Sequence, residues 1–168
     1  MKGVQKLNKS ITAAFADFGI TKMQLTTDYG YYASNKSIDY RLTEGHIEDI
    51  WFNEFVKERF GLTVKNTFMF SILHEIGHHE TIEEIYESDF LYDFCMKEKE
   101  RIHKKMQKAS AKKSKKLEWE YFNLPDEIAA TAWAVDYIRH HKKKLETIWE
   151  NVQNALVEFY ALNLDEED

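Results

Sequence analysis

Residues 66–80, with the sequence NTFMFSILHEIGHHE, decide how the middle of this chain folds and carry its most specific chemical pattern. Asn66 or Thr67 is suited to cap a helix that runs to about Glu80. Apolar residues recur at helical spacing and predict a buried stripe on one side of that helix. The stripe comprises Met69, Ile72, Leu73 and Ile76.

His74 and His78 lie four residues apart on this helix, so both imidazoles project from one face. This spacing is typical of zinc metallopeptidases, in which the glutamate after the first histidine, here Glu75, is the general base. With 7 His and 19 Glu in 168 residues, about 0.03 H-E-x-x-H matches are expected by chance. The alternatives are a surface histidine pair and a glutamate that is ion-paired or has lost its catalytic role. Gly77, inside the helix, costs about 1 kcal/mol relative to alanine and so predicts close packing there.

Two histidines leave zinc short of a catalytic ligand set, so a third protein ligand is expected downstream. Glu127 is the strongest candidate, because it begins an otherwise apolar, alanine-rich helix in which a buried charge needs a partner. Small side chains would let two helix backbones approach closely at Ala129, Ala130, Ala132 and Ala134. Alternatively, Glu127 only favours the helix dipole from the first turn, a rule that Asp126, also a candidate ligand, satisfies equally well.

The sequence His-Glu-Ile-Gly-His at 74–78, followed by Glu-Ile-Ala-Ala-Thr-Ala-Trp-Ala at 127–134, resembles the small zincin peptidases of the glutamate-ligand type. It is most similar to the ImmA/IrrE-like metallopeptidases of phages, mobile elements and bacterial stress regulation. In that family a helix beginning E-x-x-A-x-x-F-A supplies the third zinc ligand. The resemblance implies Zn²⁺ held by His74, His78 and Glu127, with Glu75 as catalytic base. It also implies limited cleavage of a regulatory protein, such as a repressor.

The resemblance covers residues 22–80 and 120–140, including a small sheet before the motif helix. His78 and Glu127 are 49 positions apart, a longer separation than is usual in the family's compact members. Trp133 replaces the usual phenylalanine, and Thr131 stands where asparagine or aspartate is common.

Composition predicts one globular domain spanning residues 1–168, with 43% hydrophobic and 14% aromatic residues. A net charge of −6 gives no general case for nucleic-acid binding. Cys95 is the single cysteine, which excludes an internal disulfide and fits a reducing compartment. The first six residues have no apolar stretch typical of a signal peptide, and no run of 18 apolar residues indicates a membrane span. These features predict a cytoplasmic protein.

The periodicity of the chain predicts an α+β, mostly helical, zincin-like fold with a small, mainly antiparallel sheet before the motif helix. Strands are expected near residues 23–27, 31–33 and 37–42. Further helices are expected at residues 4–18, 43–60, 82–119 (as one helix or two), 126–140 and 142–162. The acidic tail at 165–168 is expected to fray.

A basic helical insertion is expected around residues 97–116, which hold ten Lys or Arg against two Glu. Such a stretch is commonly a solvated helix face. Alternatively it docks an acidic partner, or nucleic acid near a DNA-bound substrate. The stretch has no interleaved aromatic residues, which argues against a dedicated nucleic-acid module.

Other candidate residues surround the motif without a pattern that chooses among them. His79 points about 100° away from His78 around the helix, which predicts a structural or exposed role. His140 and His141 are typical of a helix end. Asp136 is a candidate hydrogen-bond partner for the outer nitrogen of a ligand histidine. Candidate donors to an oxyanion are Tyr86, Tyr137 and His141.

Three hypotheses follow from these patterns. The first is a zinc peptidase whose partner is a protein or peptide substrate. The second is a catalytically inactive zincin-like binding or regulatory module that uses the basic stretch as its contact surface. The third is a fortuitous motif in a helical interaction protein.

Overall fold

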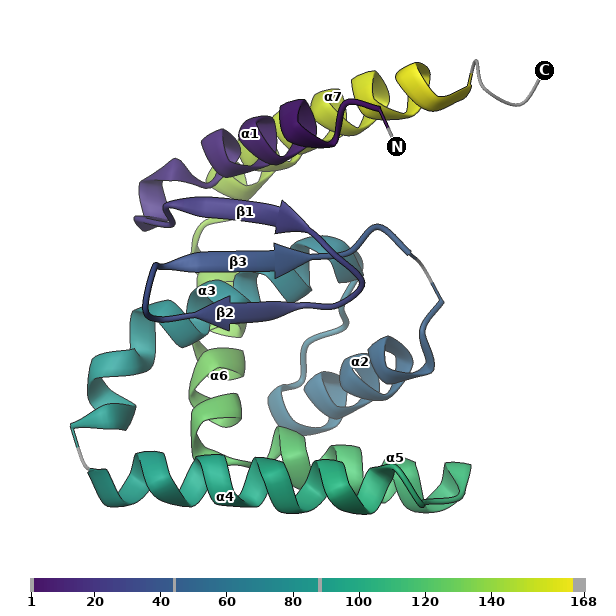
Figure 1. Cartoon of the computed structure of the whole chain (residues 1–168). Coiled ribbons are helices and arrows are strands. Elements are labelled where there is room, and N and C mark those ends of the chain that lie inside the picture. The colour runs from purple at the N-terminus through teal and green to yellow at the C-terminus, as the bar shows by residue number, and fades with distance from the viewer. Residues whose placement is uncertain (1, 44, 88, 165–168) are drawn as a thin grey trace. The chain divides into compact units, whose positions relative to one another are not determined.

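The computed structural model describes residues 2–43, 45–87 and 89–164. They divide into two compact units, one formed by Met1–Leu42 with Tyr137–Asp168 and the other by Thr43–Asp136. Most of the described residues are helical and the rest include one small sheet (Figure 1), so the expected α+β, mostly helical class is confirmed. The expectation of one domain stays a prediction, and the fraying tail lies outside the described residues.

The first unit combines the two ends of the chain. Helix α1 packs beside α7 (Figure 1), and apolar residues of both helices, such as Ile11 and Val152, are fully buried. The expected helix over residues 4–18 ends early, and a short 3₁₀ turn replaces its last part. The elements are α1 (Val4–Ala14), the 3₁₀ turn (Ala16–Phe18), β1 (Lys22–Leu25), β2 (Gly30–Tyr32), β3 (Ser37–Tyr40) and α7 (Lys142–Leu164).

The sheet is mixed, so the expectation of a mainly antiparallel sheet is wrong. Its order is β1-β3-β2, with β3 parallel to β1 and antiparallel to β2 (Figure 1). Ile38 and Tyr40 of β3 are fully buried, whereas β1 fully buries only Met23. The most buried strand, β3, is therefore the central one. After β1 the chain forms β2 at the opposite edge of the sheet and then returns as β3 between the two.

Side chains of α1 cover the outer edge of β1. The backbone N–H of Leu25 and the hydroxyl of Tyr40 both donate to Oδ1 of Asn8, at 2.9 and 2.8 Å. The backbone N–H of Met23 donates to Oγ1 of Thr12 at 2.8 Å. An edge strand otherwise exposes unpaired backbone groups, so these side chains close the sheet on that side.

The second unit is helical. The motif helix α3 begins after Asn66, whose side chain accepts from the backbone N–H of Met69 at 3.0 Å, as expected for an N-cap. It extends past the expected end at Glu80, and the expected helical region over 82–119 forms two further helices after it. The elements are α2 (Ile47–Phe60), α3 (Thr67–Tyr86), α4 (Asp89–Met106), α5 (Ala111–Phe122) and α6 (Pro125–His140), whose last residues belong to the first unit.

Helix α3 is buried on more than its apolar stripe. Every residue from Met69 to Gly77 is buried, including His74 and Glu75. The alternative of a solvated surface pair is therefore wrong for His74, which is 6% exposed. Among the described residues, no helix has the length and apolar character needed to span a membrane.

Candidate metal centre

The site is built where α3 and α6 approach each other at Gly77 and Ala130. A Cβ atom on Gly77 would lie 2.3 Å from the carbonyl oxygen of Ala130, far inside van der Waals contact. Ala130 and Ala134 are fully buried, so the small residues of α6 do allow the close approach that the sequence predicts. Since Glu127 lies one turn before Ala130, the crossing brings its carboxylate to the histidines on either side of Gly77.

His74, His78 and Glu127 converge on one point. Oε2 of Glu127 lies 3.0 Å from Nε2 of His74 and 3.5 Å from Nε2 of His78. One ligand atom from each residue lies within 4.8 Å of the others. Ligands at the usual bond lengths around tetrahedral zinc are separated by about 3.3–3.5 Å. The 3.5 Å separation from His78 lies in that range, and the 3.0 Å separation from His74 is slightly shorter.

The donor chemistry of the site also fits a metal cation. Oγ1 of the fully buried Thr131 lies 3.1 Å from Nδ1 of His74. When Nδ1–H donates to this hydroxyl, Nε2 presents a lone pair toward the carboxylate of Glu127. Nε2 of His74 and Oε2 of Glu127 are 3.0 Å apart, and two lone pairs that face each other at this distance repel unless a proton or a metal ion lies between them. The ring of Phe52 on α2 packs edge-on against His74 at 5.1 Å and limits its rotation.

Thr131 takes the place that the sequence suggested for Asp136. Asp136 is exposed, and the hydroxyl that meets His74 comes from one turn after Glu127 on the buried side of α6. In the sequence, Thr131 stands out only as a departure from the family pattern. Its position four residues after Glu127 is the signal that could have identified it.

Glu127 is held as an anion. Burial alone would raise its pKa, but His78, His74 and Lys99 together hold the pKa well below its usual range. A carboxylate must be deprotonated to bind a metal, so the residue is in the form that a ligand needs.

Lys99 on α4 is a member of the site that the sequence analysis missed. Its Nζ lies 2.6 Å from Oε1 of Glu127 and also forms an ion pair with Oδ2 of Asp126. Asp126 is thus outside the group that could hold a metal ion. Of the two acidic residues of this turn, Glu127 is the one that faces the histidines. Burial lowers the pKa of Lys99, but Glu127, Tyr121 and Asp126 raise it by more, so the ammonium stays charged.

Glu75, the candidate base, is buried on α3 beside His74. The ring of Tyr121 on α5 lies 5.3 Å from Nζ of Lys99. Burial, with the charges of Glu127 and Glu75, raises the pKa of its phenol well above the usual value. Tyr121 therefore stays protonated and is a hydrogen-bond donor that the sequence analysis did not single out. Among the candidate donors that it did name, burial, with the charge of Asp126, raises the pKa of Tyr86. The rings of Tyr137 and His141 stack on each other in the first unit.

The remaining histidine candidates lie away from the ligand group. His79 is half-buried on α3, consistent with the expected structural role. His140 ends α6 and is exposed, as is His141 directly after it.

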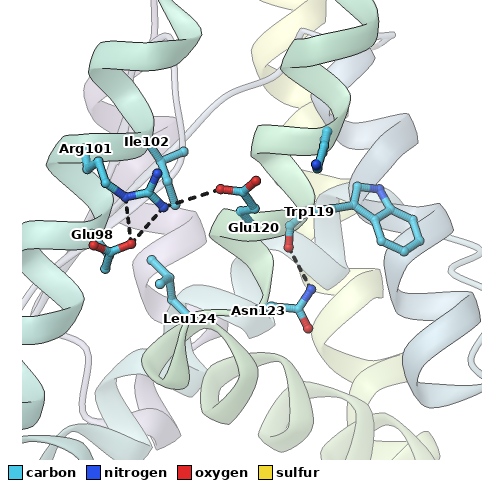
Figure 2. Close-up of a pocket in the computed structure, with 8 residues that line it drawn as sticks. Glu98, Arg101, Ile102, Trp119, Glu120, Asn123 and Leu124 are labelled. Carbon is cyan, nitrogen blue, oxygen red and sulfur yellow. Dashed lines mark hydrogen bonds and ion pairs between the residues drawn. The ribbon is translucent and has the colours of Figure 1, made fainter.

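A pocket of about 420 Å³ lies between α4 and α5 (Figure 2). Arg101 bridges Glu98 and Glu120 at its rim, with 2.8 and 3.3 Å between the charged atoms, so the rim charges are largely neutralised within the protein. Neither the histidines nor Glu127 line this pocket. It is distinct from the metal centre.

The basic stretch forms the end of α4, the following turn and the start of α5. Its expected solvated character holds for the exposed lysines, among them Lys105, Lys108, Lys112, Lys113 and Lys116. Lys99 is the exception, because its side chain is only 18% exposed.

Comparisons of the chain with protein-family profiles, with curated proteins and with solved structures find no match. The arguments for function therefore rest on the geometry of the site and on the sequence motif.

Proposed function

We propose that this chain is a cytoplasmic zinc-dependent peptidase, a hydrolase with His74, His78 and Glu127 as metal ligands and Glu75 as general base. One observation carries the proposal: Nε2 of both histidines faces the same oxygen of Glu127 at 3.0 and 3.5 Å. This convergence depends on residues 53 and 49 positions apart. A fortuitous H-E-x-x-H match would not require it.

Zinc bound to this ligand set would polarise a water molecule and a substrate carbonyl group. The residues of the chain supply the rest. Glu75, a buried carboxylate that follows His74 in the chain, would accept the water proton and pass it to the leaving amine. Thr131 holds the imidazole of His74 in orientation. Tyr121, protonated and with its ring 5.3 Å from Nζ of Lys99, is the candidate donor to the developing oxyanion.

The class of substrate follows from the family resemblance. ImmA/IrrE-like peptidases are associated with regulatory proteins of phages and mobile elements, so the proposed substrate is a repressor-like protein cleaved at a limited number of bonds. In this proposal the site residues catalyse hydrolysis of a peptide bond, and the substrate-binding surface determines which sequence is cleaved.

The second candidate function is a zincin-like binding module without catalysis. It is favoured by five exposed lysines of α4, α5 and the turn between them that form no ion pair with the residues the structure describes: Lys105, Lys108, Lys112, Lys113 and Lys116. Such an unneutralised group of charges would attract an acidic partner.

Glu75→Gln separates the two functions. The wild-type protein, loaded with zinc and incubated with a proteome-derived peptide library, is expected to yield cleavage products detectable by mass spectrometry. Glu75→Gln should keep its zinc and lose about 10²-fold or more of that cleavage, because the proton acceptor is gone. Glu80→Gln, an exposed change on the same helix, serves as the matched control. Zinc-loaded wild type and Glu75→Gln with equal, background-level cleavage would reject the peptidase and leave the binding module.

A further inference from the structure

The two carboxylate oxygens of Glu127 have different partners: Lys99 contacts one, and the two histidines face the other. Its Nζ lies 2.6 Å from Oε1, whereas Oε2 faces Nε2 of His74 at 3.0 Å and Nε2 of His78 at 3.5 Å. The carboxylate is almost completely buried, with 5% of its side chain exposed. Water therefore has little access to Oε1, and the lysine is the donor that meets it.

We propose that Lys99 is a positioning residue that keeps Glu127 a one-oxygen ligand. A carboxylate can bind a metal through one oxygen or through both, and the second mode would take up the position that a catalytic zinc site keeps for water. By holding Oε1, Lys99 leaves one oxygen for the metal. The inference rests on the zinc site proposed above and deepens it.

Lys99 is itself held in place from several sides. Asp126 forms an ion pair with its ammonium group, and the ring of Tyr121 lies under that group at 5.3 Å. Along α4, Lys99 shares a face with Cys95 and Ile102, both fully buried. The side chain of Lys99 thus starts from a buried face of α4 and is directed at Glu127, with 18% of it exposed to solvent.

A role limited to charge balance is the rival explanation. Asp126 and Glu127 are adjacent buried carboxylates, and a cation beside them offsets the cost of burying both charges. Charge balance depends on the net charge of the group. Positioning depends instead on a donor at Oε1, so a variant that removes Lys99 and one carboxylate together distinguishes the two roles.

The test uses Co²⁺ in place of zinc, because its visible absorption reports coordination number. Wild-type protein with Co²⁺ is expected to show the intense absorption of a four-coordinate ion. In Lys99→Met the freed Oε1 joins the metal, and the absorption per bound Co²⁺ falls by about twofold or more as the ion becomes five-coordinate. Lys104→Met, an exposed change on the same helix, should leave the spectrum unchanged.

The double variant Lys99→Met with Asp126→Asn removes one positive and one negative charge and so guards against misfolding of the single variant. The positioning role predicts that it keeps the weakened spectrum. A wild-type spectrum in the double variant, or in a folded Lys99→Met, would overturn the role of Lys99 while leaving the metal site intact. Wild-type protein that binds neither Co²⁺ nor Zn²⁺ would overturn both.

Discussion

The two units of this chain bury polar groups in different ways. Among the described residues of the first unit, the buried polar side chains are Ser37 and Arg41. Those of the second unit are Ser71, His74, Glu75, Asp126, Glu127 and Thr131.

Burial of charge costs free energy unless partners offset it. The first unit buries one charged side chain, Arg41, whereas the second buries a group of them. There, acidic and imidazole groups meet within hydrogen-bonding distance, with one lysine beside them. In the first unit, neutral side chains such as Asn8 and Thr12 close a sheet edge. The contrast teaches that the two units bury polar groups for different local reasons: in the first unit they close a sheet edge, and in the second they form the group that could hold a metal ion.

The largest effect is expected at the helix crossing. Gly77→Ala places a methyl group 2.3 Å from the carbonyl oxygen of Ala130, so α3 and α6 must separate. The variant should lose about 3 kcal/mol or more of unfolding free energy, seen as a large fall in Tm. It should also lose metal binding, since the separation moves Glu127 from the histidines.

Gly30→Ala in the first unit is the matched control. Its Cβ would have its nearest neighbour at 3.7 Å, and the expected change in unfolding free energy is below about 1 kcal/mol. Equal Tm values for the two variants would show that the helices are not in close contact at Gly77.

A smaller effect is expected from Thr131→Val. The change removes the hydroxyl at Nδ1 of His74 while keeping the shape of the side chain. Zinc affinity, measured by competition with a chelator, should fall by about 10–100-fold. Thr147→Val, which removes an exposed hydroxyl from α7 in the first unit, should leave affinity unchanged; equal affinities in all three proteins would argue against the orienting role of Thr131.

Asn8→Ala tests the other side of the comparison. The variant leaves the N–H of Leu25 and the hydroxyl of Tyr40 without their acceptor. Thermal unfolding should show a loss of about 1–3 kcal/mol. Zinc content should stay at the wild-type value, and a loss of zinc in folded protein would break the assignment of metal binding to the second unit alone.

The smallest effect is expected at the exposed lysines. Lys105→Ala and Lys112→Ala should each change the unfolding free energy by less than about 0.5 kcal/mol, because both residues are exposed and neither forms an ion pair with the part of the chain that the structure describes. Zinc affinity should also be unchanged. A marked stability change would mean that this surface is packed in solution.

The sequence was most informative where one residue type has few physical explanations. A glycine inside a helix predicted close packing, and Gly77 lies directly against Ala130. An asparagine before an apolar periodic run predicted the helix start, and Asn66 is the N-cap. A charge at the start of an apolar helix predicted that Glu127 needs partners, and it has them.

The sequence was least informative where many similar residues compete. Lys99 is one of ten basic residues within residues 97–116, and only its helical spacing from Cys95 and Ile102 marks it as inward-facing. Tyr121 is one of nine tyrosines, and its place beside Lys99 depends on how α4 and α5 pack. Strand direction was missed because alternation predicts which residues are buried but does not tell which strands pair.

Metal analysis of purified protein is the most direct test of the central claim. Wild-type protein prepared without added zinc is expected to contain about one zinc ion per chain, and folded Glu127→Gln is expected to contain little or none. Circular dichroism establishes that the variant is folded. Wild-type protein without zinc, even after incubation with the ion, or Glu127→Gln with the wild-type zinc content, would contradict the account.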